Sequence, residues 1–252
     1  MTTPAVSARG LTMGFGERTI MENLDFDIHT GEIFIILGGS GCGKSTLLKH
    51  LVGLHRPMAG QVTVAGLPMN PEDAAGYRRI LDRIGVMYQG GALFSSMTLA
   101  ENVALPIAEY TALPPRAIAD LVRLKLRQVG LEGFEHHLPE ELSGGMKKRA
   151  AIARALALNP EILFLDEPSA GLDPISSADL DSLILRLNRT LGTTFVVVTH
   201  ELSSIFTIAG RIIMLDKASK SIIADGDPRY LRDHSPHPFV RQFFNRQPEM
   251  EA

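Results

Sequence analysis

A run of small residues early in the chain has the composition of a phosphate-binding loop. It reads Gly38-Gly39-Ser40-Gly41-Cys42-Gly43-Lys44-Ser45-Thr46. The glycines let the backbone wrap an anion without Cβ clashes, so its N–H groups can face the α- and β-phosphates of a nucleotide. Lys44 is expected to reach the β/γ oxygens, and the Ser45 hydroxyl to ligate Mg²⁺. A glycine-rich turn without a ligand is the alternative, and the complete GxxxxGK[ST] pattern argues against it.

Two adjacent carboxylates follow an apolar run in the second half of the chain. Residues 162–165 read Ile-Leu-Phe-Leu and precede Asp166 and Glu167, as expected of a buried strand that brings both carboxylates to its carboxyl edge. Ligands bind at that edge in open parallel sheets. We therefore expect Asp166 to face the Mg²⁺ of a bound nucleotide and Glu167 to hydrogen-bond the attacking water. A solvated Asp-Glu turn is the alternative.

A second candidate anion site precedes another helical segment. Ser143, Gly144 and Gly145 stand directly before it, and Ser143 is the expected N-cap. Exposed N–H groups and the helix dipole favour an anion there. Because the chain has one phosphate-loop lysine, this helix end is expected to serve a nucleotide held by a second copy, which predicts a two-fold dimer with shared sites. A capped helix without a ligand is the alternative.

Strand-like and helical segments alternate along the chain. The expected strands cover 33–37, 84–88, 162–165 and 194–199, and the expected helices lie near 45–54, 116–129, 146–157 and 176–191. This alternation predicts an α/β fold, a P-loop nucleotide-binding domain with a parallel core sheet. The first thirty residues and segment 60–66 have short alternating patterns, which predict a small antiparallel β layer beside that sheet.

The expected organisation is one nucleotide-binding domain over 1–233 and a C-terminal tail over 234–252. An inserted helical subdomain is expected at about 93–145, with Pro106, Pro114-Pro115 and Pro139 as breaks. The tail is expected to be loop-like except for one short amphipathic helix. Its apolar residues recur at i and i+4, namely Phe239, Val240, Phe243 and Phe244. Packing on its own domain is favoured over packing on a second copy.

Composition excludes several classes of protein. At 252 residues and 45% hydrophobic content, the chain can bury its own core. A net charge of −3 offers no basic field for nucleic acid. The single cysteine cannot form an intrachain disulfide, the first residues lack a signal-type pattern, and no run of 18 apolar residues is present. We expect a cytosolic chain whose membrane role depends on a partner.

The order of motifs resembles that of the ATP-binding-cassette (ABC) ATPases over roughly residues 6 to 230. The order is the phosphate loop, Gln89, Leu142-Ser143-Gly144-Gly145, Asp166-Glu167, Gly171-Leu172-Asp173 and Thr199-His200. The resemblance implies an ATPase with ATP and Mg²⁺ as cofactors. It implies that Phe15 stacks on adenine, that Gln89 joins the Mg²⁺ shell and senses a membrane partner, that Asp173 lines the dimer seam, and that His200 contacts the γ-phosphate.

One departure narrows the resemblance. Met146 follows Ser143-Gly144-Gly145, where most of the family has glutamine. This methionine, and segment 89–103, look like the ATPases of Mla/MCE-type phospholipid transporters. That resemblance implies a homodimer on the cytoplasmic face of the bacterial inner membrane, attached to transmembrane permease subunits, with a periplasmic MCE lipid-binding subunit in the complex. Apolar residues after Gln89 either form a groove for a permease helix or belong to the core, namely Leu93, Phe94, Met97 and Leu99.

Other functions fit the sequence less well. A GTPase needs Asn-Lys-x-Asp, and residues 215–218 read Leu-Asp-Lys-Ala. Soluble ABC proteins of DNA repair or translation usually carry two cassettes or a long coiled coil, and neither is present. A regulator without hydrolysis would lack Glu167 or His200, and both are present. The remaining alternative is an ABC ATPase that serves another permease, such as an amino-acid or ion importer.

Overall fold

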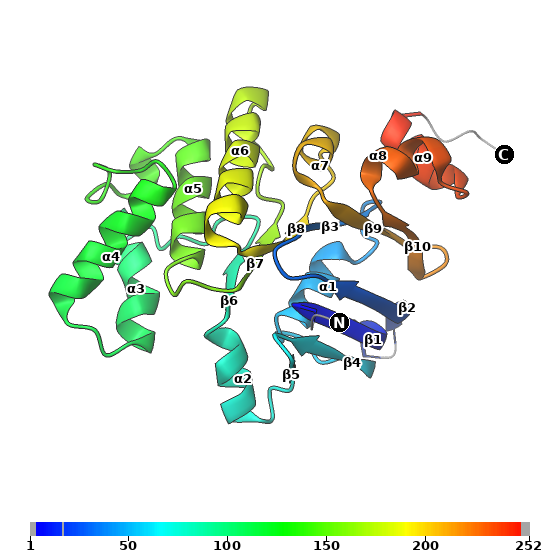
Figure 1. Ribbon diagram of the computed structural model, residues 1–252, viewed down its shortest axis with the longest axis horizontal. Helices are drawn as coiled ribbons and strands as arrows, with labels where there is room; N and C mark the ends of the chain where they lie inside the picture. The colour runs from blue at the N-terminus through cyan, green and yellow to red at the C-terminus, as the bar shows by residue number, and fades with distance from the viewer. Residues whose placement is uncertain (1–3, 17, 248–252) are drawn as a thin grey trace.

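The computed structural model describes residues 4–16 and 18–247, and the described strands form two sheets (Figure 1). The start of the chain, where the sequence has no signal-type pattern, lies outside the described residues, as do residues 248–252. The first sheet is antiparallel and confirms the expected β layer. It consists of β1 (Val6–Phe15), β2 (Arg18–Ile28), β4 (Ala59–Val64) and β5 (Leu67–Pro68). Its first two strands are longer than the short strands expected.

The second sheet is the core of the fold, in the order β10-β9-β3-β8-β7-β6. Its strands are β3 (Ile33–Gly38), β6 (Ile84–Met87), β7 (Ile162–Asp166), β8 (Thr194–Val198), β9 (Arg211–Asp216) and β10 (Ser221–Gly226). Strands β9, β3, β8, β7 and β6 are parallel, which confirms the expected parallel core sheet, and β9 is a strand that the sequence pattern did not predict. Strand β10 adds an antiparallel edge, because the short connection from β9 can only reverse the chain.

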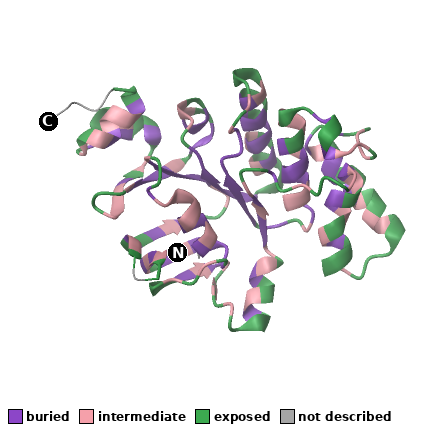
Figure 2. Ribbon diagram, turned by 180° about the vertical axis from the view of Figure 1, so that it is seen from behind, coloured by how far each residue is buried: buried purple, intermediate pink, exposed green. Residues whose placement is uncertain are grey.

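Apolar residues on the two faces of the core sheet belong to two different hydrophobic cores. Along β3, Ile35 packs with the helices on one face, whereas Phe34 and Ile36 pack with the antiparallel sheet and α1 (Lys44–Leu51) on the other. Every residue of β3, β7 and β8 is buried, which explains their continuous apolar runs. Figure 2 shows this buried sheet at the centre of the molecule, with exposed residues on the outer helices.

The remaining helices surround the two sheets. They are α2 (Ala74–Leu81), α3 (Leu99–Tyr110), α4 (Pro115–Gln128), the 3₁₀-helix η1 (Pro139–Glu141), α5 (Gly144–Ala155), α6 (Pro174–Leu191), α7 (Leu202–Ile208), α8 (Pro228–His234) and α9 (Pro238–Asn245). Helices α3, α4 and α5 pack on one another at one end of the molecule (Figure 1). In the described part of the chain, no helix has both the length and the apolarity to span a bilayer.

The expectation that Pro106 breaks a helix is wrong, because α3 continues through it. Proline removes one intrahelical hydrogen bond. Two features compensate for that loss: a capping box between Thr98 and Glu101, and the burial of Val103 and Ile107 against the core. Pro115, by contrast, opens α4 at its first turn, where the missing N–H costs nothing.

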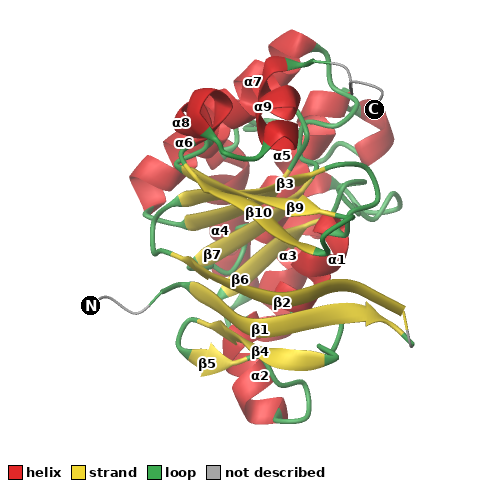
Figure 3. Cartoon of the chain, turned by 90° about the vertical axis from the view of Figure 1, so that its right-hand side faces the viewer, coloured by secondary structure: helices red, strands yellow, loops and turns green. Residues whose placement is uncertain are grey.

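The C-terminal segment is more ordered than a loop-like tail. Helix α9 forms as expected from its apolar spacing, and Val240 and Phe244 are buried in the core. The ring centroid of Phe244 lies 5.6 Å from that of Phe206 in α7. Packing on its own domain is therefore what the structure shows. Figure 3 shows α7, α8 and α9 on the side of the core sheet opposite the antiparallel layer.

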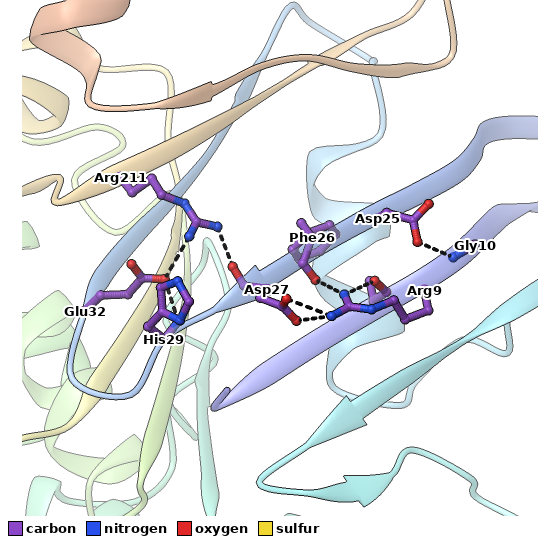
Figure 4. A network of polar contacts seen from close by, with 9 residues as sticks. Arg9, Gly10, Asp25, Phe26, Asp27, His29, Glu32 and Arg211 are labelled. Carbon is purple, nitrogen blue, oxygen red and sulfur yellow. Dashed lines mark hydrogen bonds and ion pairs between the residues drawn. The ribbon is translucent and has the colours of Figure 1, made fainter. Parts of the chain in front are cut away.

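A polar network joins the two sheets (Figure 4). In the antiparallel sheet, Arg9 makes two 2.7 Å contacts with the Asp27 carboxylate. From β9 of the core sheet, the Arg211 guanidinium donates to the Asp27 carbonyl oxygen and pairs with Asp225 at 2.9 Å and Glu32 at 3.9 Å. The same guanidinium lies 4.9 Å from the centroid of the Phe34 ring. Arg211 therefore contacts both layers.

Candidate active site

The phosphate-loop motif connects β3 to α1, as its pattern predicts. Strand β3 ends at Gly38 and α1 begins at Lys44. A Cβ on Gly38 would lie 2.4 Å from the Cys42 sulfur, and Gly43 has a φ of 102° at the N-cap of α1, so both positions require glycine. The Lys44 ammonium donates to the carbonyl oxygens of Gly38 at 2.9 Å and Gly39 at 3.0 Å, which places its charge over the loop. Cys42 is 1% exposed, so only its backbone can face a ligand.

Ser45 and Asp166 meet beneath this loop. The Ser45 hydroxyl donates a 3.0 Å hydrogen bond to Oδ1 of Asp166, the last residue of β7. Burial raises the pKa of the Asp166 carboxyl, while the Ser45 hydrogen bond and the charges of Lys49 and Lys44 oppose that rise. A hydroxyl beside a buried carboxylate is an all-oxygen donor set, which suits Mg²⁺.

Glu167 and His200 form the next pair. Oε1 of Glu167 lies 2.8 Å from Nδ1 of His200, and the second oxygen, Oε2, is buried without a hydrogen-bond partner among the described residues. Glu167 has a φ of 48°, a strained backbone conformation held by a 2.8 Å hydrogen bond from its N–H to the Val198 carbonyl at the end of β8. The Glu167 carboxylate therefore has one oxygen in contact with His200 and one buried oxygen without a partner in the described part of the chain.

Lys148 of α5 is a site residue that sequence reasoning missed. It is buried, and its ammonium donates to the carbonyl oxygens of Gln89 at 2.5 Å and Glu167 at 3.3 Å. Burial lowers the Lys148 pKa, although the carboxylates of Glu167 and Asp166 oppose that change. Arg154 of the same helix donates to the carbonyls of Gly91 and Ala92. The helix that follows the Ser-Gly-Gly motif thus holds the loop after Gln89.

One cavity of about 600 Å³ collects most of the predicted site residues. The predicted residues in its lining are Gly38, Gly39, Ser40, Gly41, Gly43, Lys44, Ser45, Thr46, Gln89, Glu167 and His200. Ile20 of β2 and Phe243 of α9 also line it, and neither stands in a motif that marks it in the sequence. The cavity brings phosphate-binding backbone, a cation, a carboxylate and an imidazole together.

Phe15 lies apart from this cavity, at the end of β1. Phe15 is 54% exposed, and its ring makes a T-shaped contact with the His55 ring, with 5.3 Å between centroids. An aromatic side chain at this position is therefore accessible to a ligand.

The Ser-Gly-Gly motif and Asp173 also lie outside the cavity, where they cap two neighbouring helices. The Ser143 hydroxyl accepts a 3.3 Å hydrogen bond from the Met146 N–H and confirms the expected N-cap of α5. Asp173 caps α6 by accepting from the N–H groups of Ile175 and Ser176, both at 3.0 Å. The Ser176 hydroxyl lowers the Asp173 pKa. Gly145 lies against Ser176, so both helix N-termini lie side by side.

The expected groove residues after Gln89 divide between core and surface. Leu99 is fully buried and belongs to the core, and Leu93 packs against it. Phe94 is exposed and lines a separate, mostly apolar groove of about 670 Å³ with Leu54, Leu105 and Tyr110. Leu93 and Leu99 therefore fit the expectation of a core position, and Phe94 fits the expectation of an exposed groove.

The fold and the cavity define a nucleotide-binding domain of the P-loop type. Residues 21–170 match the family described as ABC transporter, and the chain belongs to that family as its ATP-binding, ATP-hydrolysing domain. This confirms the expected family, fold class and enzyme class.

Two relatives illustrate the similarity. The chain is 42% identical over 241 residues to the probable ribonucleotide transport ATP-binding protein mkl of Mycobacterium leprae, covering 96% of this chain and 69% of the relative. It is 39% identical over 240 residues to the intermembrane phospholipid transport system ATP-binding protein MlaF of Escherichia coli K12, covering 95% of this chain and 88% of the relative. Mkl proteins of other mycobacteria are covered over 66% of their length.

Two solved structures share the fold. One is cbiO1 from Clostridium perfringens, part of the ABC transporter complex cbiONQ, with a TM-score of 0.84, 27% identity, and coverage of 92% of this chain and 91% of that one. The other is the dimeric ATP-binding cassette MJ0796 bound to ADP and Pi in a post-hydrolysis state, with a TM-score of 0.78, 32% identity, and coverage of 88% and 98%.

Proposed function

We propose that the chain is the ATPase subunit of a transporter that moves phospholipid between the inner and outer membranes of a bacterium. The observation that carries this proposal is the similarity to MlaF, which spans most of both chains. Met146 supports the proposal, because a methionine after Ser-Gly-Gly resembles the sequence of Mla/MCE-type ATPases. The mycobacterial mkl proteins, whose name refers to ribonucleotide transport, favour ribonucleotides as the second candidate substrate.

ATP is bound, in this proposal, between the phosphate loop and Phe15. The loop N–H groups and Lys44 hold the phosphates, and the exposed side chain of Phe15 stacks on adenine. Ser45, Asp166 and Gln89 would supply oxygen ligands for Mg²⁺, which would neutralise phosphate charge when bound. The 3.0 Å contact between Ser45 and Asp166 supports this donor set.

Hydrolysis in this site depends on the free oxygen of Glu167. His200 contacts Oε1, and the buried Oε2 has no other partner among the described residues, so Oε2 is the oxygen we assign to the attacking water once a nucleotide and its water occupy the cavity. The His200 ring is 62% exposed, which leaves its other nitrogen free to reach the γ-phosphate. Lys148 fixes the backbone of both Glu167 and Gln89, so it is a positioning residue of the site.

The proposed working unit is a homodimer. The capped N-termini of α5 and α6 lie outside the cavity of their own chain, which supports a role for Ser143, Gly144 and Gly145 at the nucleotide of a second copy, with Asp173 at the seam. The dimeric state of the MJ0796 cassette is consistent with this arrangement.

The permease is proposed to dock in the apolar groove beside Phe94. The loop that carries Phe94 is held in shape by Asn102, whose side chain bonds the Phe94 N–H at 2.8 Å and three backbone carbonyls. The same loop begins at Gln89 in the nucleotide cavity, so permease and ATP contact one continuous segment. We further propose that the chain works on the cytoplasmic face of the inner membrane, in a complex that includes an MCE lipid-binding subunit.

We propose the same division into domains that the sequence predicts. It consists of an ATP-binding domain over 1–233, with a helical subdomain at about 93–145, and a C-terminal tail over 234–252.

Co-purification from native membranes tests the function. The tagged chain is isolated with its partners, which are identified by mass spectrometry together with bound lipids and nucleotides. A permease with an MCE subunit and enriched phospholipid supports the proposal. A different permease without lipid enrichment overturns the substrate, and ribonucleotide retained outside the ATPase sites favours the second candidate. The matched control is the Phe94→Asp variant, which is expected to lose the permease while still binding ATP.

A further inference from the structure

The C-terminal helix α9 reaches the phosphate-binding cavity. The side chain of Phe243 lines that cavity together with Lys44, Glu167 and His200. One turn earlier, Phe239 faces the phosphate loop, because a Cβ built on Gly39 would lie 4.0 Å from its Cζ atom. Two aromatic residues of α9 therefore lie against the loop that wraps the phosphates.

Packing on the opposite side of α9 fixes this position. Val240 and Phe244 are buried in the core, and the Phe244 ring contacts Phe206 of α7. Helix α7 begins two residues after His200. Further contacts hold the ends of α9: Arg241 donates to the Ser235 carbonyl, and the Asn245 amide donates to the Arg232 carbonyl at 3.2 Å. Helix α9 thus contacts both the phosphate loop and α7, the helix that follows His200 in the sequence.

The chemistry of Phe243 differs from that of most of the cavity wall. Among the described residues that line the cavity, Ile20 and Phe243 contribute the apolar side chains, and the rest are glycines or polar residues. A phenyl ring cannot hydrogen-bond phosphate, but it excludes water from the volume that it fills. A drier cavity strengthens the attraction between the Lys44 ammonium and an anion.

We propose that Phe243 is a residue of the nucleotide site, where its ring forms an apolar wall beside the phosphates, so that α9 senses whether the site is occupied. The inference rests on the proposed role of the phosphate loop in binding ATP. It assigns to the C-terminal helix a binding role that no motif in the sequence marks.

The absence of tryptophan from the sequence permits a direct test. Phe243→Trp places a single tryptophan at the cavity, and Tyr230→Trp places one on α8, where the tyrosine is exposed and does not line the cavity. Each full-length variant is titrated with ADP and Mg²⁺, and tryptophan emission is compared with binding measured by calorimetry. We expect a saturable change for Phe243→Trp with a midpoint equal to the calorimetric Kd, and no change for Tyr230→Trp.

Two results would overturn the inference. One is calorimetric ADP binding by Phe243→Trp without any change in emission, and the other is an equal change in both variants. If the unsubstituted chain does not bind ADP in the calorimeter, the proposed ATP site itself fails, and that result is distinct from the first two.

A second pair of variants covers the case in which tryptophan does not fit. Phe243→Ala removes the wall and is expected to weaken ADP binding about fivefold, whereas Phe243→Leu retains an apolar side chain and loses about twofold or less. Tyr230→Ala is the control and is expected to keep the original affinity. Unchanged affinity in Phe243→Ala, in a protein with the original melting temperature, would overturn the proposal.

Discussion

Nδ1 of His200 lies 2.8 Å from Oε1 of Glu167, and this contact links the segments that follow the adjacent parallel strands β8 and β7. The two residues are distant in sequence but come together because both strands end at the same edge of the sheet. The contact leaves Oε2 of Glu167 buried and free of partners within the described structure. The geometry of one carboxylate therefore depends on a histidine from another strand.

Glu167→Gln is expected to retain ATP binding and to lower turnover at least a hundredfold, because an amide is a poor base for the attacking water. Binding is measured by calorimetry and turnover by phosphate release. Glu161→Gln is the matched control and should leave turnover unchanged. Glu161 is exposed and directly precedes the first residue of β7, at the end of the strand away from Glu167. Retained turnover in Glu167→Gln would remove Glu167 from the assigned role.

His200→Ala is expected to lower turnover to a similar extent, because Glu167 loses the contact that orients it. Residues that act as a unit are not additive. The double variant Glu167→Gln/His200→Ala should therefore be no slower than the slower single variant. Turnover of the four proteins, measured at saturating ATP, gives the coupling. Strictly additive losses would mean that the two residues act independently.

Lys44→Ala is expected to weaken nucleotide binding itself, by roughly ten- to a hundredfold, since it removes one charge-assisted contact to the phosphates. Equilibrium binding of ADP gives the measurement. Lys220→Ala serves as the control, because Lys220 is a surface lysine paired with Glu22 at 2.9 Å. Equal affinity of Lys44→Ala and the unsubstituted chain would contradict the phosphate-loop assignment.

Asp181→Asn is expected to change the pH dependence of stability. Burial in α6 raises the pKa of Asp181 from 3.8 to about 6, and the Glu201 charge adds to that effect. A raised folded-state pKa favours folding while the group is protonated. The contribution is complete below about pH 4 and is lost as the pH rises through 6, with up to about 3 kcal/mol at stake.

An asparagine side chain does not titrate in this range. Asp181→Asn should therefore have a larger free energy of unfolding than the unsubstituted chain at pH 7, and this difference should disappear near pH 4. Urea unfolding of both proteins across this range provides the free energies of unfolding. Asp179→Asn is the control on the same helix, since its carboxylate is exposed and pairs with Arg149. A stability difference that is constant with pH would refute the assignment.

The parts of the fold that the sequence predicts are those encoded locally. Strands β3, β7 and β8 are continuous apolar runs because both faces of the sheet are covered. The phosphate loop follows from its own glycines, lysine and serine. The N-cap at Ser143 likewise depends on residues within one helical turn.

Other features depend on contacts between distant segments. Strand β9 pairs with β3, and that pairing brings Arg211, which has the sequence context of a surface arginine, to Asp27. Lys148 has the sequence context of an exposed basic helix, yet tertiary packing buries it beside Glu167. The sequence predicts an amphipathic helix that contains Phe243, but no local signal indicates that this helix lies against the phosphate loop.

The double contact of Arg211 has a consequence for how the protein opens. The antiparallel layer carries Phe15 and the core sheet carries the phosphate loop, so in the proposed binding mode the two ends of the nucleotide rest on different sheets. Since Arg211 and the shared apolar core join these sheets, they are expected to unfold as one cooperative unit. Hydrogen exchange would then give the amides of β2 and β9 the same opening free energy. A partial opening of the protein could not release the base of the nucleotide while the phosphate loop still held its phosphates.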